Sequence, residues 1–564
     1  MKEMPFQRIL QSLIFGLFAI LLWLAAFPLT TPLPVNMFLR MDPLVFLGTC
    51  LSSRTFVTSL WPAVLLLGLT SAIGRFFCST LCPMGTTIDM ADRILISSES
   101  GKRKTPENEN QSSSRHRNLK YLFLLVLLAS AFMGASFVFL GSPLSLITRF
   151  YGLIISPILC LFTDTGLRAV RPLANRLDMT FLAYAQTETP GFALQWVTVL
   201  IFAGIFAPAF VSPRFWCRNL CPAGALLALF SFRPLIRRQV SDDCTGCGKC
   251  RKQCPMNAIA EDPFRTSHRE CIACQKCAEI CPVQAVSFSF SAASHSASKG
   301  EKPALMQSDF SGDRRKLIGA AVSGMGMAAI AMTGLNWRSN AVVPGQILDP
   351  ALIRPPGSLP EKDFLNRCIR CGECMKACPT NTLQPAGLTA GFQGFFSPVI
   401  TPRKGACEAH CNTCGQVCPT GAIAPLPLEE KICAKIGTAQ ILRHKCLAWE
   451  FDRKCLVCDE VCPYNAIDLK TLPDQKVPVP FVNESRCAGC GFCEFHCPVQ
   501  ARAAIVIEPM EAIRLQSGSY RQKTADIGLE LRIRKSGEKG AFSYGTETEN
   551  MLEGESGLPP GFTE

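Results

Sequence analysis

Cysteines recur along this chain at a spacing that suits metal binding. Four groups follow the pattern C-x2-C-x2-C-x3-C-P, and two more end in the same way after a longer first gap. The regular groups are Cys244, Cys247, Cys250, Cys254; Cys271, Cys274, Cys277, Cys281; Cys368, Cys371, Cys374, Cys378; and Cys487, Cys490, Cys493, Cys497. The stretched groups are Cys407, Cys411, Cys414, Cys418 and Cys446, Cys455, Cys458, Cys462. Three thiolates on a tight loop can reach three irons of one [4Fe–4S] cube, and the fourth can reach a neighbouring cube. The motifs therefore predict six [4Fe–4S] clusters.

The fourth cysteine of each motif is expected to serve the partner motif. For the first two motifs, one predicted cluster has Cys244, Cys247, Cys250 and Cys281, and the other has Cys271, Cys274, Cys277 and Cys254. Among the last four motifs, the two regular and the two stretched ones suggest a nested pairing, outer with outer and inner with inner. A sequential pairing also fits. Cys446 is the least regular ligand, and Cys433 is its possible substitute.

Zinc and disulfides are the competing uses for so many cysteines. Zinc sites use two C-x2-C knuckles around a tetrahedral ion, and a triple loop followed by C-P does not match them. The same loop places adjacent thiols poorly for disulfide pairing. Repetition of the motif favours clusters over both alternatives.

Two shorter cysteine pairs stand apart from these motifs. Cys78 and Cys82, like Cys217 and Cys221, form C-x3-C-P followed by a glycine. Residues four apart share one face of a helix, so each pair presents two sulfurs together. The near-repetition predicts two equivalent helical hairpins that bring the four sulfurs together. They are candidate redox thiols or metal ligands, and structural thiols at a helix contact are the alternative.

Long apolar runs must position these motifs. The chain has 564 residues, 48% of them hydrophobic and 18% charged, and a mean hydropathy of +0.21, which excludes a wholly soluble or disordered protein. Runs without charged residues reach the roughly 20 residues that cross a bilayer. They are 9–39, 55–74, 121–148, 189–213 and 317–337. The shorter apolar pieces 43–53 and 150–163 are expected as interfacial or re-entrant helices. We predict a membrane α-helical bundle of four helices, plus a fifth linking helix.

The distribution of Lys and Arg predicts the orientation. Fifteen lie in the N-terminal tail, the 75–120 loop and the stretch 214–238, against six in the alternate loops. The positive-inside rule places the former in the cytoplasm. Arg314 and Arg315 precede the fifth apolar run and resemble a twin-arginine export signal, with an ordinary stop-anchor as the alternative. The rest of the chain is then expected in the periplasm, across the bacterial inner membrane.

These elements divide the chain into six predicted parts, and the cysteine motifs make two of them α+β ferredoxin-like domains. The parts are a four-helix membrane domain (1–235), a cytoplasmic 2[4Fe–4S] domain (236–290), a linker (291–313), a twin-arginine-like transmembrane segment (314–340), a periplasmic 4[4Fe–4S] domain (341–535) and a tail (536–564).

The sequence lacks the motifs that bind other common cofactors and ligands. No histidine lies in an apolar run and no C-x-x-C-H is present, so no haem is expected. Neither a G-x-G-x-x-G opening a βα unit nor a P-loop indicates flavin or nucleotide. The net charge of +13 is not gathered in a compact basic stripe, so no nucleic acid is expected.

Both halves of the chain resemble known ferredoxin-type proteins. Residues 1–290, with the two C-x3-C-P motifs and the following two-cluster motifs, are similar to NapH, a membrane ferredoxin of periplasmic nitrate reductase systems. From Arg314 onward the chain resembles NapG and its relative MauM. The residues that carry this resemblance are Arg354-Pro355-Pro356-Gly357, Arg367-Cys368-Ile369-Arg370-Cys371-Gly372, Cys411-Asn412-Thr413-Cys414-Gly415 and Cys455-Leu456-Val457-Cys458. The departure is that two proteins normally separate are fused here.

The resemblance implies a quinol dehydrogenase module. Electrons would pass between the membrane quinone pool and a periplasmic reductase or multihaem cytochrome. The alternative is a membrane ferredoxin acting in metallocentre assembly or in metal (copper) reduction at the C-x3-C-P thiols. A purely structural scaffold leaves the cysteine motifs unexplained.

Overall fold

A computed structural model describes residues 6–29, 31, 33–97, 117–184, 189–210, 212–231, 234–290, 314–332, 352–500 and 502–534. The predicted linker 291–313 and tail 536–564 lie outside these residues. The chain forms two compact units. The first comprises residues 1–400, 412–426 and 514–516, and the second comprises 401–411, 427–513 and 517–564. The region predicted as one periplasmic domain, 341–535, is thus divided between the two units.

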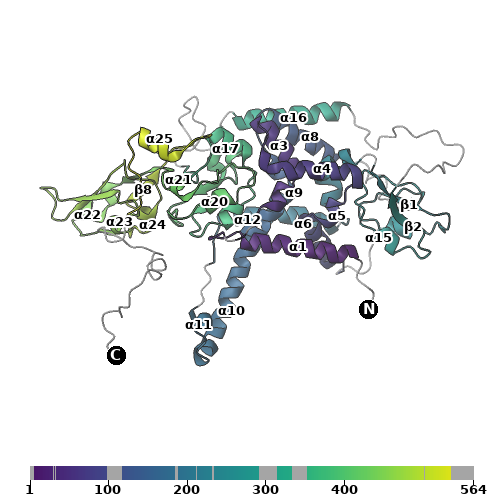
Figure 1. Ribbon diagram of the computed structural model, residues 1–564, viewed down its shortest axis with the longest axis horizontal. Helices are drawn as coiled ribbons and strands as arrows, with labels where there is room; N and C mark the ends of the chain where they lie inside the picture. The colour runs from purple at the N-terminus through teal and green to yellow at the C-terminus, as the bar shows by residue number, and fades with distance from the viewer. Residues whose placement is uncertain are drawn as a thin grey trace. The chain divides into compact units, whose positions relative to one another are not determined.

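Helices form most of the first unit before residue 232 (Figure 1). They are α1 (Phe6–Leu24), α2 (Met37–Arg40), α3 (Pro43–Ser53), η1 (Thr58–Leu60), α4 (Trp61–Ile73), α5 (Phe77–Thr80), α6 (Pro83–Ser97), α8 (Leu119–Phe132), η2 (Val138–Leu140), α9 (Pro143–Phe150), η3 (Tyr151–Ile155), α10 (Ser156–Arg176), α11 (Thr180–Tyr184), α12 (Gln195–Phe206), η4 (Ala207–Phe210), η5 (Trp216–Leu220) and α13 (Pro222–Phe230). Helix α16 (Arg314–Met332) packs on α8.

The N-terminal caps of α3 and α9 lie at the centre of this bundle. The Asp42 carboxylate accepts hydrogen bonds from the backbone N–H groups of Leu44 and Val45, at 2.9 and 3.3 Å. Ser142 caps α9 in the same manner, and its hydroxyl donates to Asp42 at 2.6 Å. Proline follows each cap, at the first helical position, where its missing N–H costs nothing. The bundle therefore contains two matching short helices joined at their starts.

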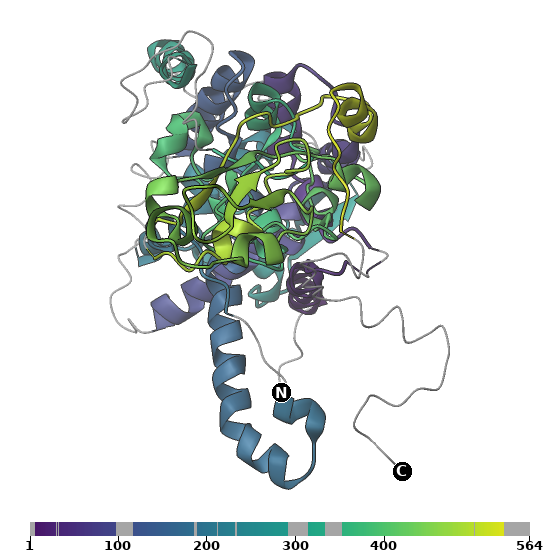
Figure 2. The same cartoon turned by 90° about the vertical axis from the view of Figure 1, so that its left-hand side faces the viewer.

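Among the residues that the structure describes, two helical segments are long and apolar enough to cross a membrane, Gln7–Leu24 and Pro143–Arg176. Four apolar helices are shorter, namely Pro43–Ser53, Thr58–Ile73, Leu119–Phe132 and Gln195–Phe210. The piece 150–163 is not the separate interfacial helix we predicted, because it forms the middle of the continuous segment from Pro143. Figure 2 shows α10 projecting away from the other helices of the first unit.

The first unit also contains two cysteine-rich parts. In one, β1 (Ile236–Val240) and β2 (Val286–Phe290) pair antiparallel, with Arg238 opposite Phe288. The helices α14 (Lys249–Lys252) and α15 (Lys276–Glu279) lie between these strands in the sequence. The other part has α17 (Glu361–Arg367), α18 (Glu373–Lys376), η6 (Leu388–Ala390), α19 (Gly391–Gly394), α20 (Thr413–Gln416) and the antiparallel pair β3 (Leu383–Pro385) and β4 (Pro398–Ile400).

The second unit contains two antiparallel strand pairs. Strand β5 (Thr438–Ile441) pairs with β8 (Ile505–Glu508), and β6 (Ile467–Lys470) pairs with β7 (Val479–Val482). Its helices are α21 (Leu428–Ile432), η7 (Arg443–Lys445), α22 (Leu447–Phe451), α23 (Val457–Glu460), α24 (Phe492–Phe495) and α25 (Tyr520–Asp526). Short helices and paired strands give both cysteine-rich regions the α+β character predicted from the sequence.

Candidate iron–sulfur centres

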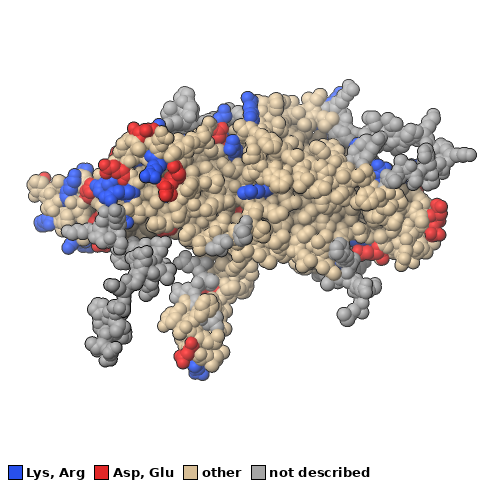
Figure 3. Space-filling model, in the orientation of Figure 1, with Lys and Arg blue, Asp and Glu red and all other residues tan. Residues whose placement is uncertain are grey.

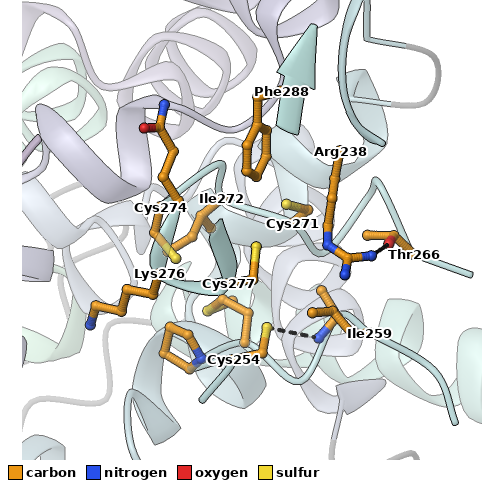
Figure 4. A pocket seen from close by; sticks show the side chains of 14 residues that line it. Arg238, Cys254, Ile259, Thr266, Cys271, Ile272, Cys274, Lys276, Cys277 and Phe288 are labelled. Atoms are coloured by element: carbon orange, nitrogen blue, oxygen red, sulfur yellow. Dashed lines mark hydrogen bonds between the residues drawn. The ribbon is translucent and has the colours of Figure 1, made fainter. Parts of the chain in front are cut away.

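Four cysteines line each of five cavities in the described part of the chain. In every case three come from one motif and the fourth comes from another. The sets are Cys244, Cys247, Cys250, Cys281 (first cavity); Cys254, Cys271, Cys274, Cys277 (second); Cys368, Cys371, Cys374, Cys418 (third); Cys446, Cys455, Cys458, Cys497 (fourth); and Cys462, Cys487, Cys490, Cys493 (fifth). Figure 4 shows the second cavity, with Cys254, Cys271, Cys274 and Cys277 gathered around it and Arg238 alongside.

The residues of these cavities fit a four-iron cube. Among the described residues, no three His, Cys, Asp or Glu side chains converge as the ligands of a single metal ion do. All 31 cysteines are free of disulfides. Backbone N–H groups donate to sulfur, for example from Ala258 to Cys254 at 3.4 Å and from Ala466 to Cys462 at 3.3 Å. Such donors stabilise the negative charge of cluster ligands.

Left-handed backbone conformations shape the ligand loops. In the motif that begins at Cys244, the residues on either side of the second cysteine, Gly246 and Gly248, have φ of 65° and 64°. Gly489 and Gly491 occupy the same positions around Cys490, with φ of 76° and 88°. Two successive turns of this kind curl the chain around the cavity, and glycine adopts them without steric cost. This requirement explains the tight C-x2-C-x2-C spacing.

The last four motifs pair in sequence order. The third cavity joins the motif of Cys368 with Cys418, whereas the fourth and fifth join the motifs of Cys446 and Cys487. The nested pairing suggested by the spacing is therefore wrong. The physical reason is the β6–β7 hairpin, which follows Cys462 and returns the chain to the motif of Cys487. The spacing between the first two cysteines of a motif has no effect on this short hairpin connection, so it does not indicate which motifs pair.

Other predicted cysteines are placed as follows. Cys446 lines the fourth cavity despite its long separation from Cys455, and the buried Cys433 lines none of the five. The four remaining motif cysteines, Cys378, Cys407, Cys411 and Cys414, divide between the two compact units. A sixth cluster stays a prediction from the sequence.

The two C-x3-C-P pairs lie together in the helical bundle. Cys82 and Cys221 belong to its hydrophobic core, and Cys78 and Cys217 pack against that core. Burial raises the pKa of Cys217 to about 12, and burial with the neighbouring thiols raises the pKa of Cys82 and Cys221. These sulfurs are therefore protonated thiols near neutral pH unless a metal or a redox reaction removes the proton.

Sequence reasoning missed two arginines that accompany these pairs. Arg75 and Arg214 each stand three positions before the first cysteine of a pair. The Arg214 guanidinium bonds Asp89 at 2.6 Å and the carbonyl of Cys78 at 3.2 Å. Arg75 lies against the second C-x3-C-P motif, since a Cβ added to Gly224 of that motif would come within 2.9 Å of the Arg75 Nη2 atom. The repeated R-x2-C-x3-C-P-x-G pattern is the signal that could have identified both arginines.

The thiol pairs lie next to the second cavity. Cys78 and Cys217 pack against Met256, Ala258 and Ile272, which also line that cavity. A buried ion cluster joins the two parts: Glu270 accepts from Arg75 at 3.2 Å and from Lys120 at 2.5 Å. Because both cations face this carboxylate, the pKa of Glu270 falls to about 2 despite burial. One layer of side chains thus separates the C-x3-C-P thiols from the cysteine ligands.

Replacing Glu270 by glutamine should weaken this junction strongly. Two buried cations would lose their carboxylate, which typically costs about 3–5 kcal/mol. Thermal unfolding and protease sensitivity of the 236–290 region would measure the effect. The control is Glu279→Gln, which breaks the exposed Arg8–Glu279 pair and should cost less than about 1 kcal/mol. Equal stability of both variants would contradict the assigned role of Glu270.

Comparisons with known proteins agree with this arrangement. A 4Fe–4S binding domain family matches residues 55–103 and 194–239, the two segments that contain the C-x3-C-P pairs. Two 4Fe–4S dicluster domain families match residues 236–282 and residues 367–422 with 453–501. Multiple 4Fe–4S ferredoxin domains are therefore present, which supports [4Fe–4S] clusters as the cofactors.

Several curated proteins are similar to part of the chain. The methylamine utilization ferredoxin-type protein MauM of Methylorubrum extorquens is 35% identical over 209 residues, which is 35% of this chain and 90% of that protein. The ferredoxin-type protein NapG of Escherichia coli is 32% identical over 30% of this chain and 75% of its own length. NapF of Escherichia coli is 34% identical over 27% of this chain and 84% of its own length. The chain belongs to the NapG/MauM family of ferredoxin-type iron–sulfur electron-transfer proteins.

Proposed function

We propose that this protein is a membrane-bound quinol dehydrogenase module that passes electrons between the quinone pool and a periplasmic redox partner. A reductase or a multihaem cytochrome would be that partner. One observation carries the proposal: within the first compact unit, two different cysteine cavities pack on two different parts of one apolar helical bundle. An electron carrier that links two aqueous compartments through lipid needs such an arrangement.

The second and third cavities make these two contacts. The second cavity adjoins Cys78, which lies in α5, and Cys217, which lies in η5. The third adjoins α3 and α9: Ser52 donates to the carbonyl of Asn366 at 2.8 Å, and Ser145 donates to that of Ile369 at 2.7 Å. Figure 1 shows β1–β2 and α17 at opposite ends of the bundle. The bundle thus holds cysteine ligands at both of its ends.

The surface of the bundle supports a lipid environment. Large apolar side chains are exposed on several helices, including Trp61 at 61%, Phe132 at 68% and Leu200 at 69%. Few charged side chains interrupt the face of the bundle that Figure 3 shows. Contiguous apolar surface of this kind needs a partner or a membrane to cover it. With the distribution of Lys and Arg, this supports four inner-membrane helices with the N-terminus in the cytoplasm, and a fifth helix that leads to the periplasm.

The cysteines of the five cavities are the proposed ligands of five [4Fe–4S] clusters. A sixth [4Fe–4S] cluster is proposed from the motif spacing alone. Bound clusters would supply one-electron carriers. The residues of the chain hold them in largely apolar cavities, donate N–H groups to their sulfur ligands and limit access of water.

A second candidate is metallocentre assembly or copper reduction. The four thiols of the C-x3-C-P pairs favour it, two of them buried and two partly buried, because soft thiol ligands bind Cu(I) well. The cysteine motifs after residue 352 favour electron transfer, since metal handling at these thiols does not need them.

Quinol-driven reduction of the protein tests the proposal. Full-length protein in liposomes, prepared without oxygen, is expected to show cluster signals in electron paramagnetic resonance after addition of menaquinol. Protease added outside oriented vesicles tests the topology, since residues 352–534 and 236–290 should be cleaved from opposite sides. Absence of quinol-driven reduction, or cleavage of both regions from one side, would contradict the proposal.

A further inference from the structure

We infer that Arg370 and Arg149 are the electrostatic partners of the centre at Cys368, Cys371, Cys374 and Cys418, and hold its reduction potential above those of the fourth and fifth centres. The inference deepens the proposed function, on which it rests for its role in electron flow. It concerns the centre that adjoins α3 and α9, where electrons would pass between the bundle and the outer clusters.

The backbone of Arg370 is the first indication. Its φ is 50°, at the motif position that glycine occupies as Gly246 and Gly489. The left-handed conformation costs a residue with a Cβ roughly 1–2 kcal/mol. Strained positions of this kind cluster at functional sites. Ala273 holds the same position of the second motif with φ 51°, so this turn tolerates a side chain, and the feature particular to Arg370 is the charge that it brings there.

The Arg370 guanidinium is buried beside the third cavity, which it helps to line. It donates to the carbonyl of Ser136 at 2.9 Å and also to the carbonyl of Gln393. Its Cζ lies 4.2 Å from the ring centroid of Phe139. These partners fix the charge in place and are all uncharged.

Arg149 lies near the same ring, with its Cζ 5.8 Å from the centroid of Phe139. It is 1% exposed, donates to the carbonyl of Phe139 at 3.1 Å and has its Cζ 4.7 Å from the centroid of Phe396. Two guanidinium groups thus share Phe139 next to one set of cysteine ligands. Like charges buried together are unfavourable unless a negative charge compensates them.

Neither arginine forms an ion pair with a carboxylate among the described residues. Three other buried arginines of the first unit do: Arg75 with Glu270, Arg214 with Asp89 and Arg354 with Glu361. The Nε atoms of Arg149 and Arg370 also lack a hydrogen-bond acceptor within the described part. A buried cation without a counter-ion costs several kcal/mol. The missing negative charge is the one that a cluster with four thiolate ligands would carry.

The carboxyl group that lines this cavity does not supply that charge. Glu373 is buried, and within the described residues it forms an ion pair with neither Arg149 nor Arg370. Lys376 and Arg40, rather than Arg149 or Arg370, are the cations that act on it. The two arginines therefore keep a net positive charge beside the cysteines.

The fourth and fifth cavities differ in this respect. Their lining includes no arginine or lysine, and Arg403, which donates to the carbonyl of Cys497 at 3.2 Å, is only partly buried. Reduction adds one negative charge to a cluster, and a nearby positive charge favours that step. The third centre should accordingly have a higher potential than the fourth and fifth, and should accept electrons at the bundle more readily.

Redox titration of the full-length protein with chemical mediators tests this inference. The signal of the third centre is identified as the one lost in Cys418→Ala. Arg370→Gly removes the charge and relieves the backbone strain, so the variant should fold. We expect the equilibrium constant for reduction of the third centre to fall at least about tenfold. For a one-electron couple this lowers the reduction potential by about 59 mV. Arg149→Gln should shift it in the same direction.

Charge-keeping variants and a neighbouring control complete the experiment. Arg370→Lys should retain most of the wild-type potential, and Arg367→Gln should shift it little, because Arg367 bonds the exposed Thr55 at 3.0 Å. An unchanged potential in Arg370→Gly, or an equal shift in Arg370→Lys, would overturn the inference. Mediators replace quinol here, so a failure of quinol oxidation would leave the potential shift measurable and would refute the proposed function alone.

Discussion

Replacing Cys78 and Cys217 by serine should abolish quinol-driven reduction of the outer clusters. Both thiols pack against the side chains that line the second cavity, at the junction between bundle and cysteine ligands. Serine keeps the shape and removes the sulfur, so the fold should survive while any thiol redox step or metal ligation is lost. Electron paramagnetic resonance after addition of menaquinol measures the effect.

Cys50→Ser and Cys160→Ser are the matched controls for this experiment. Both cysteines lie in apolar segments, α3 and α10, outside the cysteine motifs. They should leave quinol-driven reduction intact. If the Cys78 and Cys217 variants also keep it, and a separate enzyme of the host loses its metal cofactor instead, the assembly or copper-reduction reading replaces the proposed function.

Replacing Cys418 by alanine should remove the third cluster and leave the fourth and fifth. The sulfur of Cys418 completes the set that Cys368, Cys371 and Cys374 begin. A cube lacking one of four protein ligands is labile, so we expect a loss of about four iron atoms per chain. Iron analysis of anaerobically purified protein and low-temperature spectra measure this loss.

Cys497→Ala separates the sequential pairing from the nested one. Cys497 lines the cavity with Cys446, Cys455 and Cys458, so its removal should affect the fourth cluster. Under nested pairing Cys497 would serve the motif of Cys368 instead. Loss of the same cluster signal in Cys497→Ala as in Cys371→Ala would contradict the ligand sets assigned to the third and fourth cavities.

The cysteine motifs could be read from the sequence because their geometry is local. Three ligands within seven residues, with left-handed turns at positions such as Gly246 and Gly248, specify one loop whatever surrounds it. The fourth ligand comes from elsewhere in the chain, and the sequence left its partner open among the last four motifs. The β6–β7 hairpin decided that question for the motifs of Cys446 and Cys487.

For the apolar runs, in contrast, the ends of the helices could not be predicted from the sequence. Composition located them, but their helices end early, where Pro28 and Pro34 follow α1 and where Gly134 and Gly141 follow α8. Hydropathy averages over a window and does not register such breaks. Hydropathy also could not show that Pro143–Arg176 forms one continuous helical segment.

Spacing within a few residues was enough to predict which cysteines bind clusters and to mark the two C-x3-C-P pairs as a repeat. The folded chain was needed to show which motifs share a cavity, that Arg75 and Arg214 cross between the repeats, and that Arg149 lies beside Arg370. Those contacts join residues far apart in the chain, and packing of the helices and hairpins, rather than local spacing, sets them.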